Sequence, residues 1–267
     1  MSVSPSRHPL SDHQLERYAR HIVLREIGGA GQAKLSAAKV LVVGAGGLGS
    51  PLILYLAAAG VGTIGIVDFD RVSLSNLQRQ IAHGTADIGR LKTESASDTA
   101  LGINPDIRIV AHDMRMTAAN AASLIDAYDI IADGSDNFVT RFLVNDACFF
   151  GSKTLVSAAV TEFDGQLSTY KPWRQRGVFP CYRCLFPEPP PPEAAPNCSE
   201  TGVLGAVAGV MGTLQAVEVL KEIVGVGQSM AGRLMIYDAL DAQFRNVRVP
   251  ADPGCRLCGS APMIRSL

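Results

Sequence analysis

Two pairs of cysteines, each with the spacing C-x-x-C, lie in the last third of this 267-residue chain. Cys181 and Cys184 form the first pair, and Cys255 and Cys258 form the second. Four thiolates on short polar turns suit a tetrahedral zinc ion with no open position for water. The main alternative, a redox C-x-x-C, would follow a strand and open a helix, whereas the first pair leads into a proline-rich run. The spacing therefore predicts a structural Zn²⁺ that ties the end of the chain back to residue 181.

A glycine-rich segment with the pattern G-x-G-x-x-G follows the apolar run VLVV and precedes a predicted helix. Its glycines let backbone N–H groups approach a phosphate at the positive end of that helix. Asp68 ends the next predicted strand, where a carboxylate can bind ribose hydroxyls. This context predicts a nucleotide site that includes Gly44, Gly46, Gly47, Gly49 and Asp68.

The residues that follow Asp68 indicate a triphosphate rather than NAD. Asn76, Arg79 and Lys92 supply hydrogen-bond donors and positive charge beyond the ribose position. Hydride transfer does not need such a cluster, whereas a triphosphate under attack does. Two alternatives stay open: Arg79 and Lys92 as solvated surface charges, and an NAD-dependent oxidoreductase built on the glycine loop alone.

Asp136 lies in the segment DGSDN, directly after a predicted strand and close to the start of a predicted helix. In an open α/β sheet this is the carboxyl-end crevice where ligands bind. A carboxylate there can hold Mg²⁺ against phosphate oxygens. The alternative is that Asp136 caps the helix, which is a common role for aspartate.

The elements that position these residues alternate along the chain. An N-terminal helix opens at Ser11 with a capping box. Strands are then predicted at 39–43, 63–68, 107–111 and 130–133, and helices at 50–60, 93–101, 118–127 and 137–150. This order predicts an α/β fold, a Rossmann-like open and mostly parallel sheet with helices on both faces. We assign residues 1–30 to an N-terminal helical arm and residues 31–267 to a single domain that includes the zinc-tied part.

The pattern changes after the strand predicted at 154–157. A hairpin with an Asp164-Gly165 turn is expected next, and then an exposed proline-rich loop at 186–197. The apolar segment 202–220 contains Gln215 and Glu218, so we expect a buried helix and no membrane span. Two further strands, at 233–238 and 244–249, complete an antiparallel C-terminal extension.

The composition excludes some classes of protein. Hydrophobic residues make up 47% of the chain, enough for a large core, and the formal net charge is -1. That charge gives no field for binding nucleic acid. The first ten residues lack an apolar stretch typical of secretory signals, so we expect a cytoplasmic protein.

Several of these motifs together resemble the MoeB/ThiF/HesA family, relatives of ubiquitin-activating enzymes. They are GAGGLG, DFDRVSLSNLQRQ, DGSDN and CYRC with CRLC, and the resemblance runs from about residue 10 to residue 259. VSLSNLQRQ is most similar to the MoeB type. The resemblance implies an adenylyltransferase that uses ATP and Mg²⁺ to adenylate the C-terminal glycine of a ubiquitin-like, MoaD-like sulfur carrier, with release of pyrophosphate, for molybdopterin biosynthesis.

The resemblance also assigns roles to residues. Gly47 lies at the phosphates, Asp68 at the ribose, and Lys92 neutralises phosphate charge. Asp136 holds Mg²⁺. The implied nucleotide contacts further include Ser75, Asn76, Leu77, Gln78, Arg79 and Asn137.

Two further implications concern partners. Arg20 matches an arginine that the family sends into the partner's site, which implies a homodimer, although from sequence alone it is an ordinary charge on an amphipathic helix. Cys198 is a candidate nucleophile in the alternative ThiF-type reaction on a thiamine-pathway, ThiS-like carrier, whereas Cys148 is expected in the core. A sulfur donor is expected to be a separate protein. A non-catalytic nucleotide-binding scaffold is the remaining alternative.

Overall fold

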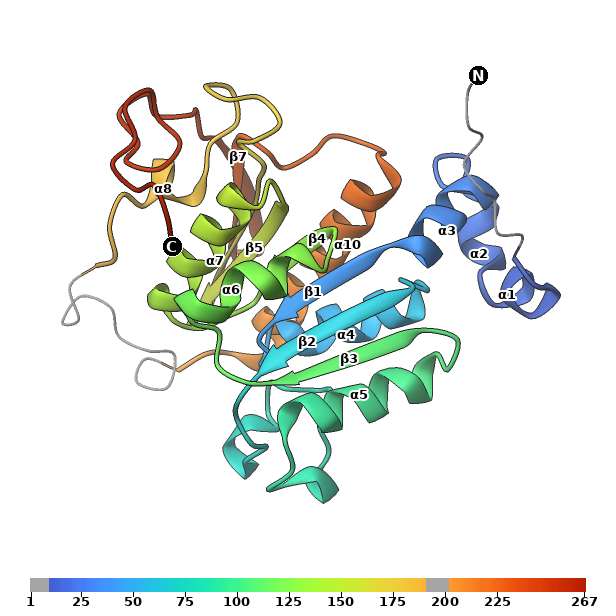
Figure 1. Ribbon diagram of the computed structural model, residues 1–267. Helices are drawn as coiled ribbons and strands as arrows, with labels where there is room; N and C mark the ends of the chain where they lie inside the picture. Colours follow the sequence, from blue (N-terminus) through green and yellow to red (C-terminus); the bar gives the residue numbers. More distant parts are fainter. Residues whose placement is uncertain (1–9, 191–201) are drawn as a thin grey trace.

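The computed structural model describes residues 10–190 and 202–267, and within these residues eight strands form one sheet (Figure 1). The strand order is β3-β2-β1-β4-β5-β6-β7-β8. Strands β1 to β5 pair in parallel, and β6, β7 and β8 continue the sheet in antiparallel fashion. The predicted Rossmann-like sheet with an antiparallel extension is therefore confirmed. The strands are β1 Lys39–Val43, β2 Thr63–Asp68, β3 Arg108–Asp113, β4 Ile130–Asp133, β5 Thr154–Thr161, β6 Asp164–Tyr170, β7 Arg233–Asp238 and β8 Gln243–Arg248.

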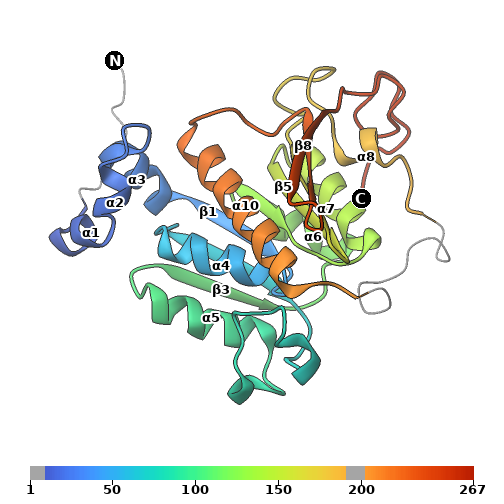
Figure 2. The ribbon, with the colours of Figure 1, turned by 180° about the vertical axis from the view of Figure 1, so that it is seen from behind.

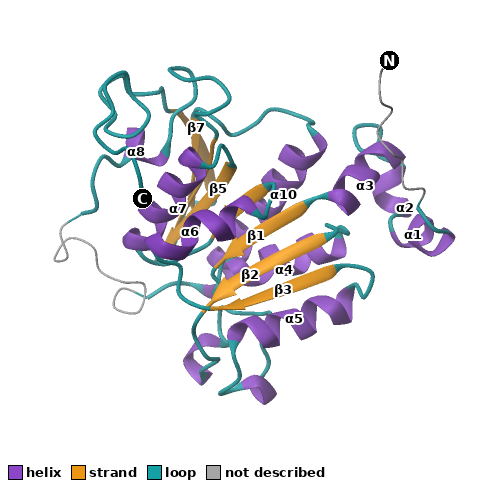
Figure 3. Ribbon diagram, in the orientation of Figure 1, coloured by secondary structure: helices purple, strands orange, loops and turns teal. Residues whose placement is uncertain are grey.

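Helices cover both faces of the sheet. Helices α4, α5 and α10 pack on one face, and α6 and α7 on the other, as Figures 1 and 2 show from opposite sides. The arm α1–α3 precedes β1, and α8 lies close to the C-terminal end of the chain (Figure 3). The helices are α1 Asp12–Arg17, α2 Ala19–Ile22, α3 Gly28–Ala37, α4 Gly49–Ala58, α5 Lys92–Ile103, α6 Ala118–Asp126, α7 Phe138–Phe150, α8 Tyr182–Leu185 and α10 Gly205–Val224, with short 3₁₀ turns η1 Leu74–Asn76 and η2 Thr85–Asp87.

The central strands are apolar throughout because both of their faces are covered. Val40 and Val42 of β1 belong to the core under α4 and α10, whereas Leu41 and Val43 belong to the core under α6 and α7. Successive side chains of a strand point to opposite faces, so one strand serves two cores. The capping box at Ser11 is confirmed, and α3 crosses residue 30, the boundary predicted for the arm.

Helix α10 is buried along one face, whereas Val217 on its other face is 48% exposed, and the buried polar side chains Gln215 and Glu218 have partners. Gln215 donates to the carbonyls of Asp133 and Val156, at 2.8 and 3.0 Å. Glu218 accepts from the Thr169 hydroxyl at 2.9 Å and also from the Met230 amide. Among the residues that the structure describes, no helix is long and apolar enough to cross a membrane.

The hairpin between β5 and β6 corrects one prediction. Asp164 and Gly165 do not form the turn but pair with Thr161 and Val160 inside the ladder, and Glu162, with φ of 45°, makes the turn with the next residue. Gly165 is required for packing instead, because a Cβ atom there would lie 2.4 Å from Met211 of α10. Tertiary packing thus explains the glycine that the sequence suggested as a turn residue.

Element ends also differ from prediction in places. Strand β3 ends at Asp113 instead of 111, because its pairing with β2 continues to Asp68. Helix α10 begins at Gly205 instead of 202, because Val203 forms a bridge with Glu162.

Candidate functional site

A cavity of about 440 Å³ opens at the carboxyl ends of the parallel strands. This is where ligands bind in open α/β sheets. Residues from the glycine loop, the end of β2, the segment after β4 and the hairpin β5–β6 line it. Of the predicted site residues, the cavity is lined by Gly44, Gly46, Gly47, Asp68, Arg79, Lys92, Asp136 and Asn137. Residues Gly49, Ser75, Asn76, Leu77 and Gln78 do not line it.

The glycine loop presents free backbone donors to this cavity. Gly44 adopts φ of 92°, and Gly49 approaches Gly44 so closely that a Cβ atom would lie 1.9 Å from the Gly44 oxygen. Within the described part of the chain, the amides of Gly46, Gly47 and Leu48 donate to no protein acceptor. Free amides next to the start of α4 suit a phosphate group.

The Asp68 carboxylate is fixed at the loop. One oxygen accepts from the Ala45 amide and the other from the Asp70 amide, both at 2.8 Å. Asp68 is nearly buried but still lines the cavity. The structure therefore places it between β2 and the glycine loop, and the ribose contact expected of it stays a prediction.

Two positive side chains reach the same cavity. Lys92 is only 6% exposed, and its ammonium donates to the Asp70 carboxylate at 2.9 Å. Arg79 donates to the Ser75 carbonyl at 3.0 Å. Asn76 has a structural task nearby, because its side-chain oxygen accepts from the Ser73 amide and caps the turn η1.

Asp136 does not cap helix α7. The cap is Asn137, whose side-chain oxygen accepts from the Thr140 amide at 2.9 Å. The capping alternative for Asp136 is therefore excluded by this geometry. Its carboxylate is exposed at the cavity, where it can serve as an oxygen ligand for a divalent cation.

Sequence reasoning missed a buried carboxylate under this segment. Asp133 is 1% exposed, and its oxygens accept from the amide and hydroxyl of Ser135 and from the Ser157 hydroxyl, at 3.0, 2.6 and 3.0 Å. The Arg141 guanidinium donates to the Ser135 carbonyl at 2.5 Å. These bonds fix the backbone that carries Asp136. The signal in the sequence that could have indicated this residue is the first aspartate of the segment DGSDN.

A second omission lies on the cavity wall. The Arg115 guanidinium stacks over the Phe69 ring at 3.8 Å, and both residues line the cavity. They come from the ends of neighbouring strands β3 and β2, 46 positions apart by residue number. No motif joins them, so only the fold brings them together.

The four predicted zinc ligands converge in a separate site. Their sulfur atoms lie within 4.8 Å of one another, with Cys181 to Cys255 at 3.6 Å and Cys184 to Cys258 at 3.4 Å. Zn–S bonds of about 2.3 Å in a tetrahedron require S–S distances of about 3.8 Å. The cluster thus fits a closed zinc site and joins α8 to the C-terminal segment.

The four sulfurs of this cluster also influence one another's protonation. Hydrogen bonds with Cys184 and Cys255 raise the pKa of the Cys181 thiol. Hydrogen bonds from the other three sulfurs lower the pKa of Cys255. Zinc binds cysteine as the thiolate, so a metal bound to these four residues would displace the protons of their thiols.

Two further cysteines, Cys148 and Cys198, are present in the sequence. Cys148 is buried in the core under α6 and α7, and burial raises its pKa well above the ordinary value, so the predicted core role is confirmed. Cys198 lies outside the described residues, as does most of the proline-rich loop predicted at 186–197.

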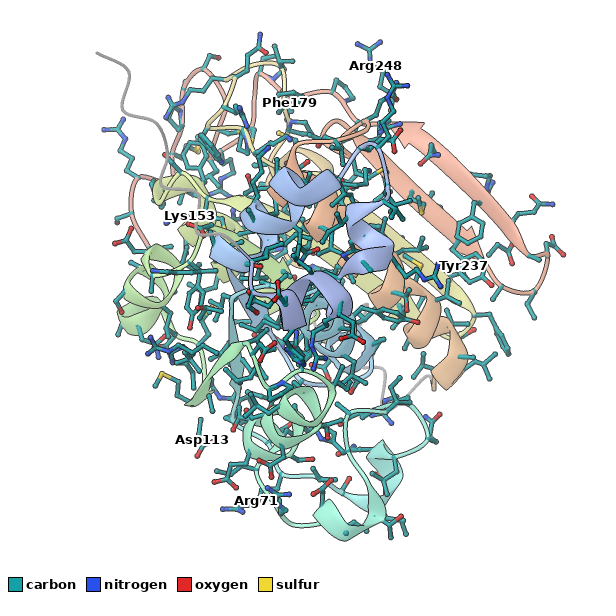
Figure 4. All side chains as sticks on the ribbon, turned by 90° about the vertical axis from the view of Figure 1, so that its right-hand side faces the viewer. Arg71, Asp113, Lys153, Phe179, Tyr237 and Arg248 are labelled. Atoms are coloured by element: carbon teal, nitrogen blue, oxygen red, sulfur yellow. The ribbon has the colours of Figure 1, made fainter. Side chains whose placement is uncertain are left out.

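Arg20 lies near the amino ends of the strands, opposite to the cavity at their carboxyl ends. It belongs to α2, in the arm that leads into the amino end of β1, whereas the cavity is at the carboxyl ends (Figure 1). In Figure 4 this arm stands in front of the sheet. Arg20 is exposed and makes no hydrogen bond or ion pair within the described residues. The fold therefore does not bring Arg20 to the cavity of its own chain.

Comparison with known proteins gives consistent matches. The model of the ThiF family matches residues 18–257. A sulfur carrier protein adenylyltransferase of Thermus thermophilus is 47% identical, covering 95% of this chain and 94% of that protein. The probable adenylyltransferase/sulfurtransferase MoeZ of Mycobacterium tuberculosis is 48% identical, and the match spans 91% of this chain but 62% of MoeZ. The adenylyltransferase and sulfurtransferase MOCS3 of Bos taurus is 48% identical over all of this chain and 58% of that protein.

Solved structures support the fold. A crystal structure of E. coli MccB superposes with a TM-score of 0.81 at 22% identity, covering 98% of this chain and 77% of MccB.

Proposed function

Because the chain belongs to the ThiF family, we propose that it is an adenylyltransferase that activates the C-terminal glycine of a ubiquitin-like sulfur carrier with ATP. One observation carries this proposal. The glycine loop with its free amides, Lys92, Arg79 and the exposed Asp136 all line one cavity. Hydride transfer needs no such combination, and a scaffold without chemistry does not need it either.

In the proposed reaction, a carboxylate oxygen of the carrier attacks the α-phosphorus of ATP. The bond between this phosphorus and the bridging oxygen breaks, and pyrophosphate leaves. The loop amides bind the phosphates, and Lys92 and Arg79 neutralise the charge that develops on their oxygens. Asp136 would hold Mg²⁺, which supplies positive charge at the phosphate oxygens when bound.

The remaining assignments belong to the same proposal. The four-cysteine cluster holds a structural Zn²⁺, the protein acts as a homodimer in the cytoplasm, and sulfur comes from a separate donor protein. Similarity of VSLSNLQRQ to the MoeB type favours a molybdopterin-pathway carrier over a thiamine-pathway one. The direct test is mass spectrometry of a carrier that ends in Gly-Gly, after incubation with the protein, ATP and Mg²⁺. Addition of AMP to the carrier is expected, and binding of NAD without such a product would contradict the proposal.

A mixing experiment tests whether Arg20 completes the site of a second copy. Arg20→Ala and Asp136→Ala proteins should each be nearly inactive. In mixed dimers one of the two sites holds both residues, so partial activity should return. The measurement is ATP–pyrophosphate exchange after subunit exchange, with heterodimers verified by native mass spectrometry. Heterodimers without any recovery would contradict a shared site.

A second experiment tests whether Cys198 is a nucleophile. A free thiol with the reference pKa of about 8.5 is mostly protonated at neutral pH and is therefore a modest nucleophile. Formation of the acyl-adenylate needs no thiol. We therefore expect Cys198→Ala to keep pyrophosphate exchange within a few-fold of the wild type. A thiol-labile carrier conjugate on non-reducing gels that disappears in this variant would instead indicate the ThiF-type reaction.

A further inference from the structure

His83 lies beneath the glycine loop and has no part in the chemistry described above. Its Nε2 atom is 3.0 Å from the Ala45 carbonyl oxygen, and its Nδ1 atom is 2.8 Å from the Ser95 hydroxyl. The side chain is 7% exposed and does not line the cavity. The ring therefore contacts the loop from outside the cavity.

The hydrogen bonds define the state of the ring. A carbonyl oxygen can only accept, so Nε2 carries the proton and donates it to Ala45. In the neutral ring Nδ1 then accepts from the Ser95 hydroxyl. Burial lowers the pKa of His83, the Ala45 bond opposes this, and Lys92 lowers it further, against the raising effect of Asp87 and Asp68. The neutral ring is thus the expected form at neutral pH.

The bond to Ala45 has a consequence for the next amide. The Ala45 carbonyl and the Gly46 N–H belong to one planar trans peptide group, so they point in opposite directions. With the carbonyl directed to His83, the Gly46 N–H points away from the ring, and Gly46 lines the cavity. The Ala45 amide is fixed as well, by Asp68 at 2.8 Å. Both peptide groups around Ala45 are therefore held.

We infer that His83 is a positioning residue for the phosphate loop, which aims the Gly46 amide at a nucleotide phosphate through its hydrogen bond to Ala45. The same ring joins the loop to α5 through Ser95, three positions after Lys92. His83 thus connects the glycine loop with the helix that carries Lys92. This inference rests on the proposed function, because it takes the cavity to hold ATP.

Two substitutions that introduce side chains of similar length distinguish the effect of losing the hydrogen bond from the effect of losing the volume of the ring. The amide nitrogen in His83→Gln occupies about the place of Nε2 and can donate to Ala45, whereas His83→Met fills space without a donor. We expect His83→Met to lower kcat/KM for ATP in pyrophosphate exchange by about 10–100-fold, the size of effect that small misplacements produce. We expect His83→Gln to recover most of this loss. Affinity for ATP, measured by calorimetry without carrier, should weaken in the same order.

His112→Met is the control for replacing an imidazole away from the cavity by the same side chain. Its Nε2 pairs with the Tyr128 hydroxyl at 2.7 Å, and it does not line the cavity. This variant should lose some stability but keep the wild-type KM for ATP. Wild-type kinetics in His83→Met, or equal impairment of folded His83→Met and His83→Gln, would overturn the inference. If the wild type itself bound no ATP, the proposed function would fail instead.

Discussion

Asp136→Ala should leave the fold intact and lower the rate of ATP–pyrophosphate exchange by about 100-fold or more. Asp136 is exposed at the cavity and takes no part in capping α7, so its removal costs the fold little. A carboxylate that holds Mg²⁺ at the phosphates would contribute through the positive charge of the metal, an effect that is typically worth several kcal/mol. The measurement is exchange at saturating ATP and carrier, together with thermal unfolding.

Asp126→Ala is the matched control for the loss of an exposed aspartate. Asp126 ends α6, and among the described residues its carboxylate pairs only with Lys153, at 3.9 Å. It does not line the cavity, so exchange should stay at the wild-type rate. Near-normal exchange in Asp136→Ala would contradict the role proposed for this carboxylate.

The second large effect concerns metal in the cysteine cluster. Purified protein should contain one zinc ion per chain, and Cys255→Ser should abolish its retention. A closed site with four thiolate ligands contributes directly to folding. We expect the midpoint of thermal unfolding to fall by about 10 °C, which for a chain of this size corresponds to about 5–6 kcal/mol. The KM for ATP of the folded fraction should change much less.

Cys148→Ala is the control for Cys255→Ser, because it removes a buried cysteine that does not belong to the cluster. Cys148 lies in the core outside the cluster, so this variant should keep its zinc and lose about 1–2 kcal/mol of stability. Elemental analysis and thermal scans of both variants provide the comparison. A metal-free protein with full stability and activity would rule out the structural zinc.

The order of the parallel strands, and the site residues that lie at their carboxyl ends, could be predicted from the sequence. Gly44, Asp68 and Asp136 each lie at or just after the end of a predicted strand. Because parallel strands end at one edge, three distant segments meet there. The C-x-x-C spacing predicted the cysteine cluster for a comparable reason, since each pair is local and only their meeting depends on the fold.

Contacts between distant polar residues were beyond prediction. The bond from His83 to Ala45 spans 38 positions, and that from Gln215 to Asp133 spans 82. Such partners have no sequence signature, because any buried polar side chain takes whichever group the packing brings near. The predicted turn at Asp164-Gly165 was wrong because Gly165 is needed for packing: it makes room for Met211, a residue distant in sequence. Local preference there yielded to the packing of α10 against the sheet.

The most direct test of the proposed activity is ATP–pyrophosphate exchange with a matched pair of carriers. One is an intact ubiquitin-like sulfur carrier ending in Gly-Gly, and the other lacks only these two glycines. The account predicts Mg²⁺-dependent exchange with the intact carrier and none with the truncated one, because the attacking group is the terminal glycine carboxylate. Equal exchange with both carriers, or none with any intact carrier from the molybdopterin and thiamine pathways, would contradict it.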